Sequence, residues 1–120
     1  MVAEANQTAA AASYIPRTFV LLVGNMPVGT VSLAGHDFEG RPDLRPWLAG
    51  LFVAPEARRQ GHATRLIAHV EQYARNAAIP VLWLYTNTAE TLYARAGWHT
   101  VETVRDDGRP FALMRRDLTR

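Results

Sequence analysis

The stretch "LFVAPEARRQGHATRLIAHV", residues 51–70, leads from a strand into a helix through a turn rich in arginine. An apolar run ends at Val53, and a proline interrupts the pattern. After Gly61 the apolar residues recur at the i, i+3, i+4, i+7 spacing of an amphipathic helix. We therefore expect a central strand over residues 47–53, apolar on both faces and covered on both sides, and a helix from Gly61 to about Ala77.

The turn has the composition of an anion-binding site. The first backbone N–H groups of a helix have no intrahelical partner, and the macrodipole places partial positive charge at that end. Gly61 has no side chain to block a ligand, and Arg58 and Arg59 can donate charge-assisted hydrogen bonds to phosphate oxygens. These residues are a candidate pyrophosphate cradle; taken alone, they fit equally well a solvated basic loop with a glycine at the helix start.

The remaining segments predict a mixed sheet. Further strands are expected over residues 17–23, 27–33, 80–86, 98–104 and 110–118, and a second helix over residues 89–97. Gly24-Asn25 and Asp107-Gly108 favour hairpin turns. The order β-β-β-α-β-α-β-β predicts an α/β (α+β) fold with a mixed, mostly antiparallel twisted sheet, a central parallel strand pair and helices packed on it. The polar loop over residues 34–46 is long for a connection, which is typical of functional loops.

The composition narrows the class of protein. A chain of 120 residues, 48% hydrophobic, fits one domain over residues 17–120, with residues 1–16 as a loosely ordered tail or arm. The absence of cysteine favours a reducing cytoplasm, and the four histidines are scattered, so we expect no metal site. The net charge of +2 comes without a basic run, and no apolar stretch approaches the roughly 20 residues of a membrane span. We therefore expect neither nucleic-acid nor membrane binding.

Two segments follow a known pattern of residues. Val53, Pro55, Arg58, Gly61 and Ala63 are spaced as V-x-P-x-x-R-x-x-G-x-A. The segment "AETLYARAGW", residues 89–98, follows A-x-x-L-Y-x-x-x-G-F with tryptophan at the aromatic place. Both motifs resemble those of the GNAT superfamily of acetyl-CoA-dependent N-acyltransferases, and the order of elements agrees with that family.

The resemblance implies roles for individual residues, with acetyl-CoA as co-substrate and no metal. Backbone groups of Phe52 and Val53 would pair with the pantetheine arm. Tyr93 would protonate the departing thiolate or donate a hydrogen bond to it, and Thr86 or Asn87 would contact the pantetheine or phosphate region. The pyrophosphate would be held by the turn and the first residues of the helix: Arg58, Arg59, Gln60, Gly61, His62, Ala63 and Thr64.

The general base is the least defined part of the predicted site. Many relatives use a glutamate on or near the central strand, but residues 47–53 contain no carboxylate. The candidates are His36, Asp37 and Asp43 in the long loop, or a chain of water molecules. We take His36 as the first candidate, because an imidazole titrates near neutral pH.

The resemblance thus predicts an N-acetyltransferase that moves an acetyl group from acetyl-CoA to an amine of a small molecule or peptide by direct attack in a ternary complex. The alternatives are a non-catalytic acyl-CoA-binding or regulatory module and a purely structural domain. Family members usually begin with a strand and one or two helices, whereas about 16 residues precede the first expected hairpin here. A partner subunit can complete such a site, so we also expect a homodimer.

Overall fold

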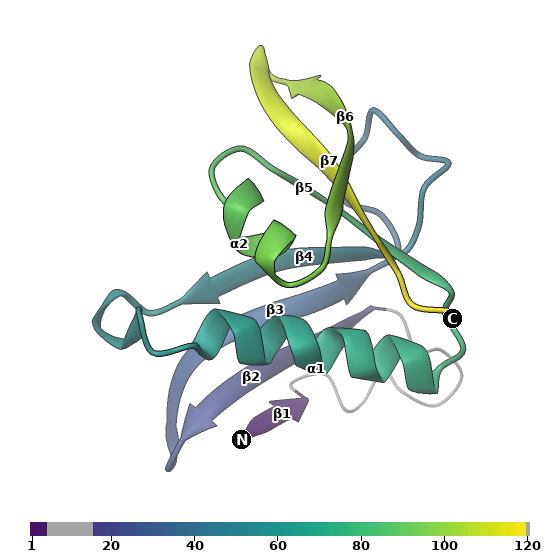
Figure 1. Ribbon diagram of the computed structural model, residues 1–120. Coiled ribbons are helices and arrows are strands. Elements are labelled where there is room, and N and C mark those ends of the chain that lie inside the picture. The colour runs from purple at the N-terminus through teal and green to yellow at the C-terminus, as the bar shows by residue number, and fades with distance from the viewer. Residues whose placement is uncertain (5–15, 120) are drawn as a thin grey trace.

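The computed structural model describes residues 1–4 and 16–119, and its strands form a single twisted sheet (Figure 1). The strand order is β1-β2-β3-β4-β5-β7-β6, and every neighbouring pair is antiparallel except β4 and β5. The strands are β1 (Val2–Glu4), β2 (Arg17–Val23), β3 (Met26–Ala34), β4 (Trp47–Val53), β5 (Val81–Thr86), β6 (His99–Asp106) and β7 (Arg109–Asp117). The helices are α1 (His62–Asn76) and α2 (Glu90–Arg95), and a short 3-10 turn, η2, covers Pro55–Ala57. The predicted fold class is confirmed.

Most predicted elements lie where the sequence pattern places them. β2 and β4 have the expected bounds, and α1 begins and ends within a residue of its expected range. The segment expected to be a tail differs, because residues 2–4 form β1 and pair with β2. Residues 5–15 of that segment lie outside the described part of the chain. Neither helix of the described residues is long and apolar enough to cross a membrane.

The main core lies between α1 and the sheet, where α1 runs across β2, β3 and β4 (Figure 1). Its helical side is the buried face of α1: Leu66, Ile67, Val70 and Ala74. A second, smaller cluster contains Phe38, Trp47 and Leu113. Because side chains alternate along β5, Trp83 and Tyr85 of this cluster point away from the main core. The long loop over residues 34–46 therefore covers the opposite face of the sheet through Phe38.

The one parallel pair opens into a fork. β4 is in register with β5 only at Trp47 and Trp83, and beyond that point the two strands diverge (Figure 1). β4 also bulges against β3, where two of its residues face one, and Gly50 takes a left-handed φ of 64° there. The second half of β4 is consequently uncovered on one side, with Phe52 52% exposed. The expectation of a strand covered on both sides is wrong for this half.

A buried carboxylate on α1 ties the helix to the far part of the sheet. Glu71 is 6% exposed, and its Oε2 accepts a hydrogen bond of 2.9 Å from Trp98 Nε1. Its other oxygen lies 3.4 Å from Arg116 Nε on β7, and Arg116 Nη1 donates to the Gly97 carbonyl at 3.0 Å. The network fixes the turn between α2 and β6 against α1.

We expect Glu71→Ala to destabilise the protein by about 3 kcal/mol, because it leaves a buried indole N–H and a guanidinium without their acceptor. Urea unfolding measures this free energy. Glu71→Gln, which can still accept from Trp98, is expected to cost less. Gln72→Ala on the exposed side of the same helix is the control, with a change within about 0.5 kcal/mol. Equal effects of the two alanine variants would contradict a structural role for the Glu71 network.

Candidate functional site

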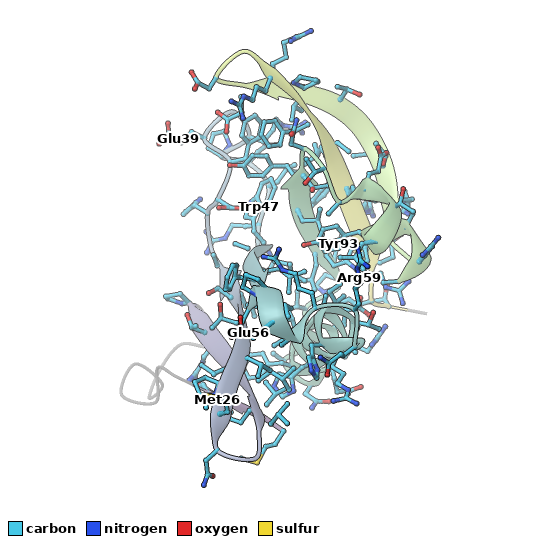
Figure 2. The ribbon with its side chains drawn as sticks, turned by 90° about the vertical axis from the view of Figure 1, so that its left-hand side faces the viewer. Met26, Glu39, Trp47, Glu56, Arg59 and Tyr93 are labelled. Carbon is cyan, nitrogen blue, oxygen red and sulfur yellow. The ribbon has the colours of Figure 1, made fainter. Side chains whose placement is uncertain are left out.

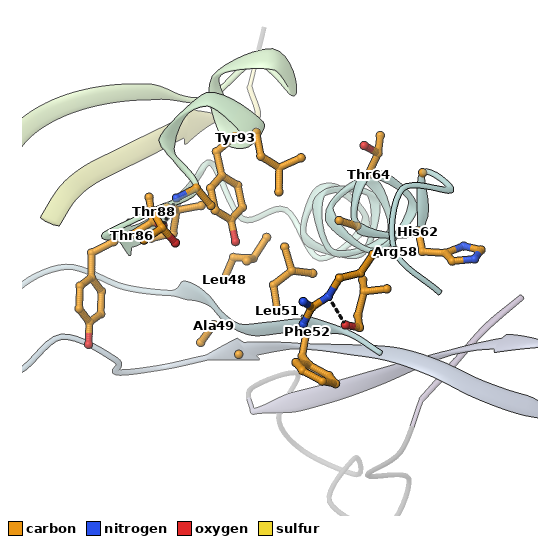
Figure 3. A pocket seen from close by; sticks show the side chains of 18 of the residues that line it. Leu48, Ala49, Leu51, Phe52, Arg58, His62, Thr64, Thr86, Thr88 and Tyr93 are labelled. Carbon is orange, nitrogen blue, oxygen red and sulfur yellow. Dashed lines mark hydrogen bonds between the residues drawn. The ribbon is translucent and has the colours of Figure 1, made fainter. Parts of the chain in front are cut away.

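A cavity of about 670 Å³ fills the fork between β4 and β5 (Figure 3). Its walls come from four parts of the chain: residues 48–53 of β4, residues 57–59 and 61–64 between η2 and the first turn of α1, residues 84–86 of β5 with residues 88–89 after it, and residues 92–93 of α2. Asp37 from the long loop completes the lining. The cavity therefore exists because β4 and β5 separate, and every wall depends on the fork.

The start of α1 forms one end of the cavity. Gly61 precedes the helix with a φ of 81°, and no side chain caps the helix start. The first turn closes when Arg65 N donates to the Gly61 carbonyl at 3.1 Å, so the preceding N–H groups of the helix have no partner within α1. A Cβ on Gly61 would meet no protein atom within 4 Å. The glycine is thus required by its backbone conformation, and the space beside it is open for an anion.

Arg58 lies across the end of β4 in this cavity (Figure 3). Its Nε donates to the Val53 carbonyl at 2.9 Å, and its guanidinium carbon lies 5.7 Å from the centroid of the Phe52 ring. Arg58 therefore covers the strand end predicted to pair with a pantetheine arm. A ligand that donates to the Val53 carbonyl would compete with this hydrogen bond.

Tyr93 projects from α2 into the middle of the cavity, with its hydroxyl directed toward Leu48 and Leu51 (Figure 3). The residue is 6% exposed, and no hydrogen bond of its hydroxyl to a described residue contributes to its pKa. Burial raises the pKa of Tyr93 to about 12, so the phenol is protonated at neutral pH. Trp98 holds it in place, since the two rings are 6.0 Å apart and Trp98 N donates to the Tyr93 carbonyl at 3.1 Å.

The cavity brings together most of the residues that the sequence singled out for the coenzyme. Lining it are Phe52, Val53, Arg58, Arg59, Gly61, His62, Ala63, Thr64, Thr86 and Tyr93. Gln60 and Asn87 are exposed residues outside the lining, and Asn87 Nδ2 donates to the Pro110 carbonyl at 2.8 Å. Thr86, unlike Asn87, lines the cavity, and its hydroxyl accepts a hydrogen bond of 3.0 Å from Ala89 N. The ring of His62 points away from Arg58 and the cavity (Figure 3).

The three loop candidates for a general base are separated by the structure. His36 lines a shallow depression on the long loop, outside the main cavity. Asp43 is paired with Arg41, and hydrogen bonds from that guanidinium lower the pKa of Asp43. Asp37 lines the main cavity, where partial burial of its carboxyl group and then repulsion from Asp106 raise the pKa of Asp37. Of the three, only Asp37 combines access to the cavity with a raised pKa.

Sequence reasoning missed the apolar walls of the cavity. Leu48, Leu51, Leu84 and Leu92 line it together with Tyr85 and Thr88. In the sequence these leucines look like ordinary core positions, and two of them, Leu48 and Leu84, are almost fully buried. Their second role depends on the bulge at Gly50, for which the sequence offers only the glycine itself as a signal.

This sheet, forked at its parallel pair with a free helix start beside the fork, defines the acyl-CoA N-acyltransferase fold. The model of the acetyltransferase (GNAT) family matches residues 3–98 of the chain. The chain therefore belongs to the acetyltransferase (GNAT) family, and it is an acyltransferase. No curated protein matches the chain in sequence.

Solved structures share this fold at low sequence identity. An aminoglycoside 6'-N-acetyltransferase complexed with coenzyme A has a TM-score of 0.76 and 12% identity, over 96% of this chain and 79% of that chain. A GNAT family acetyltransferase from Elizabethkingia anophelis with acetyl-CoA bound has a TM-score of 0.71 and 17% identity, over 98% of this chain and 97% of that chain. An acetyltransferase of the GNAT family from Streptococcus pneumoniae has a TM-score of 0.75 and 16% identity, over 93% and 72% of the two chains.

Proposed function

We propose that the protein transfers an acetyl group from acetyl-CoA to an amine by direct attack in a ternary complex. The observation that carries this proposal is the single cavity that joins the free start of α1, the Tyr93 hydroxyl and the Asp37 carboxyl group. An anion site, an acid and a base in one space are the groups that this reaction needs. The coenzyme A and acetyl-CoA complexes of proteins with the same fold support the choice of acyl donor.

The coenzyme would enter along the end of β4. Backbone N–H groups from Arg59 to Thr64 and the charge of Arg59 would hold the pyrophosphate, since the space beside Gly61 is open and the Arg58 N–H already donates to the Pro55 carbonyl. The pantetheine arm would take the position of the Arg58 side chain over Phe52 and Val53. Arg58, once displaced from the Val53 carbonyl, is free to pair with a phosphate. The leucine walls would place the thioester against apolar side chains.

The chemistry then divides between Asp37 and Tyr93. The amine nitrogen attacks the thioester carbonyl carbon, a C–N bond forms, and the C–S bond breaks as the thiolate leaves. Asp37 takes the proton that the amine loses, directly or through one water molecule. A thiol has an ordinary pKa of about 8.5, well below the value of about 12 for Tyr93. Complete proton transfer from Tyr93 is therefore uphill in the empty cavity, and Tyr93 stabilises the thiolate chiefly as a hydrogen-bond donor.

Coenzyme binding has a direct test in thermal unfolding. Acetyl-CoA at one hundred times its Kd is expected to stabilise the protein by about 2.7 kcal/mol, which raises the Tm by roughly 10 °C for a chain of this size. Gly61→Val is expected to remove most of this shift, because a branched side chain would occupy the space for the pyrophosphate. Gly24→Val is the matched control, since Gly24 has a φ of 61° and open space in a distant hairpin.

Both valine variants are strained in the same way, so both lower the Tm of the free protein. Only Gly61→Val should lose the response to acetyl-CoA. The absence of any shift in the unmodified protein would rule out the coenzyme assignment. A clear shift without coenzyme A release from any amine would favour a non-catalytic acyl-CoA-binding module.

A further inference from the structure

Three carboxylates lie around the Tyr85 hydroxyl, beside the cavity, and one of them lines it. Asp37 lines the cavity, Asp106 ends β6, and Glu39 lies on the long loop, on the other side of Trp47 from Arg59 (Figure 2). Tyr85 joins them, because its hydroxyl donates to Asp106 Oδ2 at 3.5 Å and the charges of all three carboxylates act on it. Asp37 and Asp106 are close enough for their charges to repel. We call Asp37, Glu39 and Asp106 the acidic rim.

The acidic rim has no positive partner in the described residues. Other carboxylates of the same sheet are paired: Glu102 with Arg41, and Asp117 with Arg115. No ion pair among residues 1–4 and 16–119 includes a member of the acidic rim. Arg109 lies opposite Asp106 in the register of β6 and β7 but forms no ion pair with it. Because the like charges are held together without an ion pair, a cation that binds here relieves their repulsion.

An aromatic wall supports the acidic rim. The Tyr85 ring packs against Phe38 and Phe111 with centroids 4.9 and 5.2 Å apart, and against the edge of Trp47 at 6.1 Å. Packing on three sides holds the Tyr85 ring, and its hydroxyl lies 3.5 Å from Asp106 Oδ2. Aromatic faces beside carboxylates suit an alkylammonium group, whose methylenes pack on rings while its charge meets the oxygens.

The acidic rim is continuous with the proposed reaction centre. Asp37 and Tyr85 line the same cavity as Tyr93, a polar side chain more than nine-tenths buried whose hydroxyl faces that cavity without a partner. An amine held beside Asp37 can therefore reach the acetyl group, while the rest of the same molecule extends toward Asp106.

We propose that the acceptor is a small aliphatic molecule with at least two cationic groups, one of which reacts beside Asp37 while the other binds Asp106 and Glu39 against Tyr85. The inference rests on the proposed acetyl transfer and adds its substrate class. Acetylation converts one ammonium-forming nitrogen into a neutral amide, so the product carries one positive charge fewer than the substrate. The acidic rim therefore holds the product more weakly than the substrate, which favours product release.

Paired substrates test this proposal. Linear α,ω-diamines of four to six carbons are compared with n-alkylamines of equal chain length, with coenzyme A release as the assay. We expect kcat/KM for the diamines to exceed that for the monoamines by about tenfold or more, because one partly screened ion pair contributes binding free energy of that order. Asp106→Asn should abolish this preference by lowering kcat/KM for the diamines far more than for the monoamines, while asparagine still accepts from Tyr85. Asp107→Asn, with the same change in net charge at an exposed turn position, should keep the preference.

A binding measurement separates failure of the inference from failure of the proposed reaction. The Tm of the protein saturated with coenzyme A is recorded with each amine, without turnover. If diamines stabilise the protein, Asp106→Asn removes this stabilisation and no amine is acetylated, then diamine binding at the acidic rim is upheld and the proposed acetyl transfer is overturned. Two outcomes would overturn only the proposed binding of a second cationic group at the acidic rim. These are turnover of monoamines and diamines at equal rates, and a diamine preference that survives Asp106→Asn. Neither diamine binding nor turnover would overturn both.

Discussion

Replacement of Tyr93 by phenylalanine is expected to lower kcat by about 100-fold and to leave the Kd of acetyl-CoA nearly unchanged. The phenol is the only hydroxyl that α2 aims into the cavity, and it has no partner there among the described residues. Its removal therefore costs the departing thiolate a hydrogen bond. The ring stays in place because its contact with Trp98 does not involve the hydroxyl.

The measurement separates kcat from coenzyme affinity, by steady-state kinetics and by the thermal shift with acetyl-CoA. Tyr73→Phe on α1 is the matched control, because Tyr73 packs against Phe19 and does not line the cavity. We expect its kcat to equal that of the unmodified protein. A Tyr93→Phe variant with undiminished kcat would remove Tyr93 from the mechanism. A loss confined to the Kd would assign it to coenzyme binding.

Replacement of Asp37 by asparagine is expected to lower kcat/KM by about 100-fold at neutral pH, because the protonated amine then lacks a base. The base acts in its ionised form, and burial and Asp106 raise the pKa of Asp37 from its ordinary value. The rate of the unmodified protein should therefore fall as the pH drops through this raised pKa. In the variant that fall disappears, and the rate follows deprotonation of the free amine instead.

The ratio of the rate of the unmodified protein to that of Asp37→Asn should consequently fall as the pH rises toward the pKa of the amine. His36→Asn and Asp43→Asn are the controls on the same loop, since neither residue lines the cavity. Both are expected to keep nearly full activity. A large loss with His36→Asn, or a loss in Asp37→Asn that is constant across pH, would refute Asp37 as the base.

The elements of the fold could be read from local patterns in the sequence. The period of α1, the alternation in β2 and the turn residues at Gly24 and Gly108 each depend on neighbours along the chain. The turn at Arg58 and Gly61 was predictable for the same reason, since a helix start forms from consecutive residues. The short β1 was missed, because three residues carry no period of their own.

The tertiary structure decided which groups meet. Gly50 in the bulge and the single register pair between Trp47 and Trp83 open the fork, and neither follows from the composition of β4. Asp37 rather than His36 reaches the cavity because the loop is anchored by Phe38 against Tyr85. The sequence by itself determined the elements, the family motifs and the coenzyme turn, which rest on local spacing. The base, the acidic rim and the cavity depend on contacts between distant segments, which only packing of the sheet, helices and loop brings together.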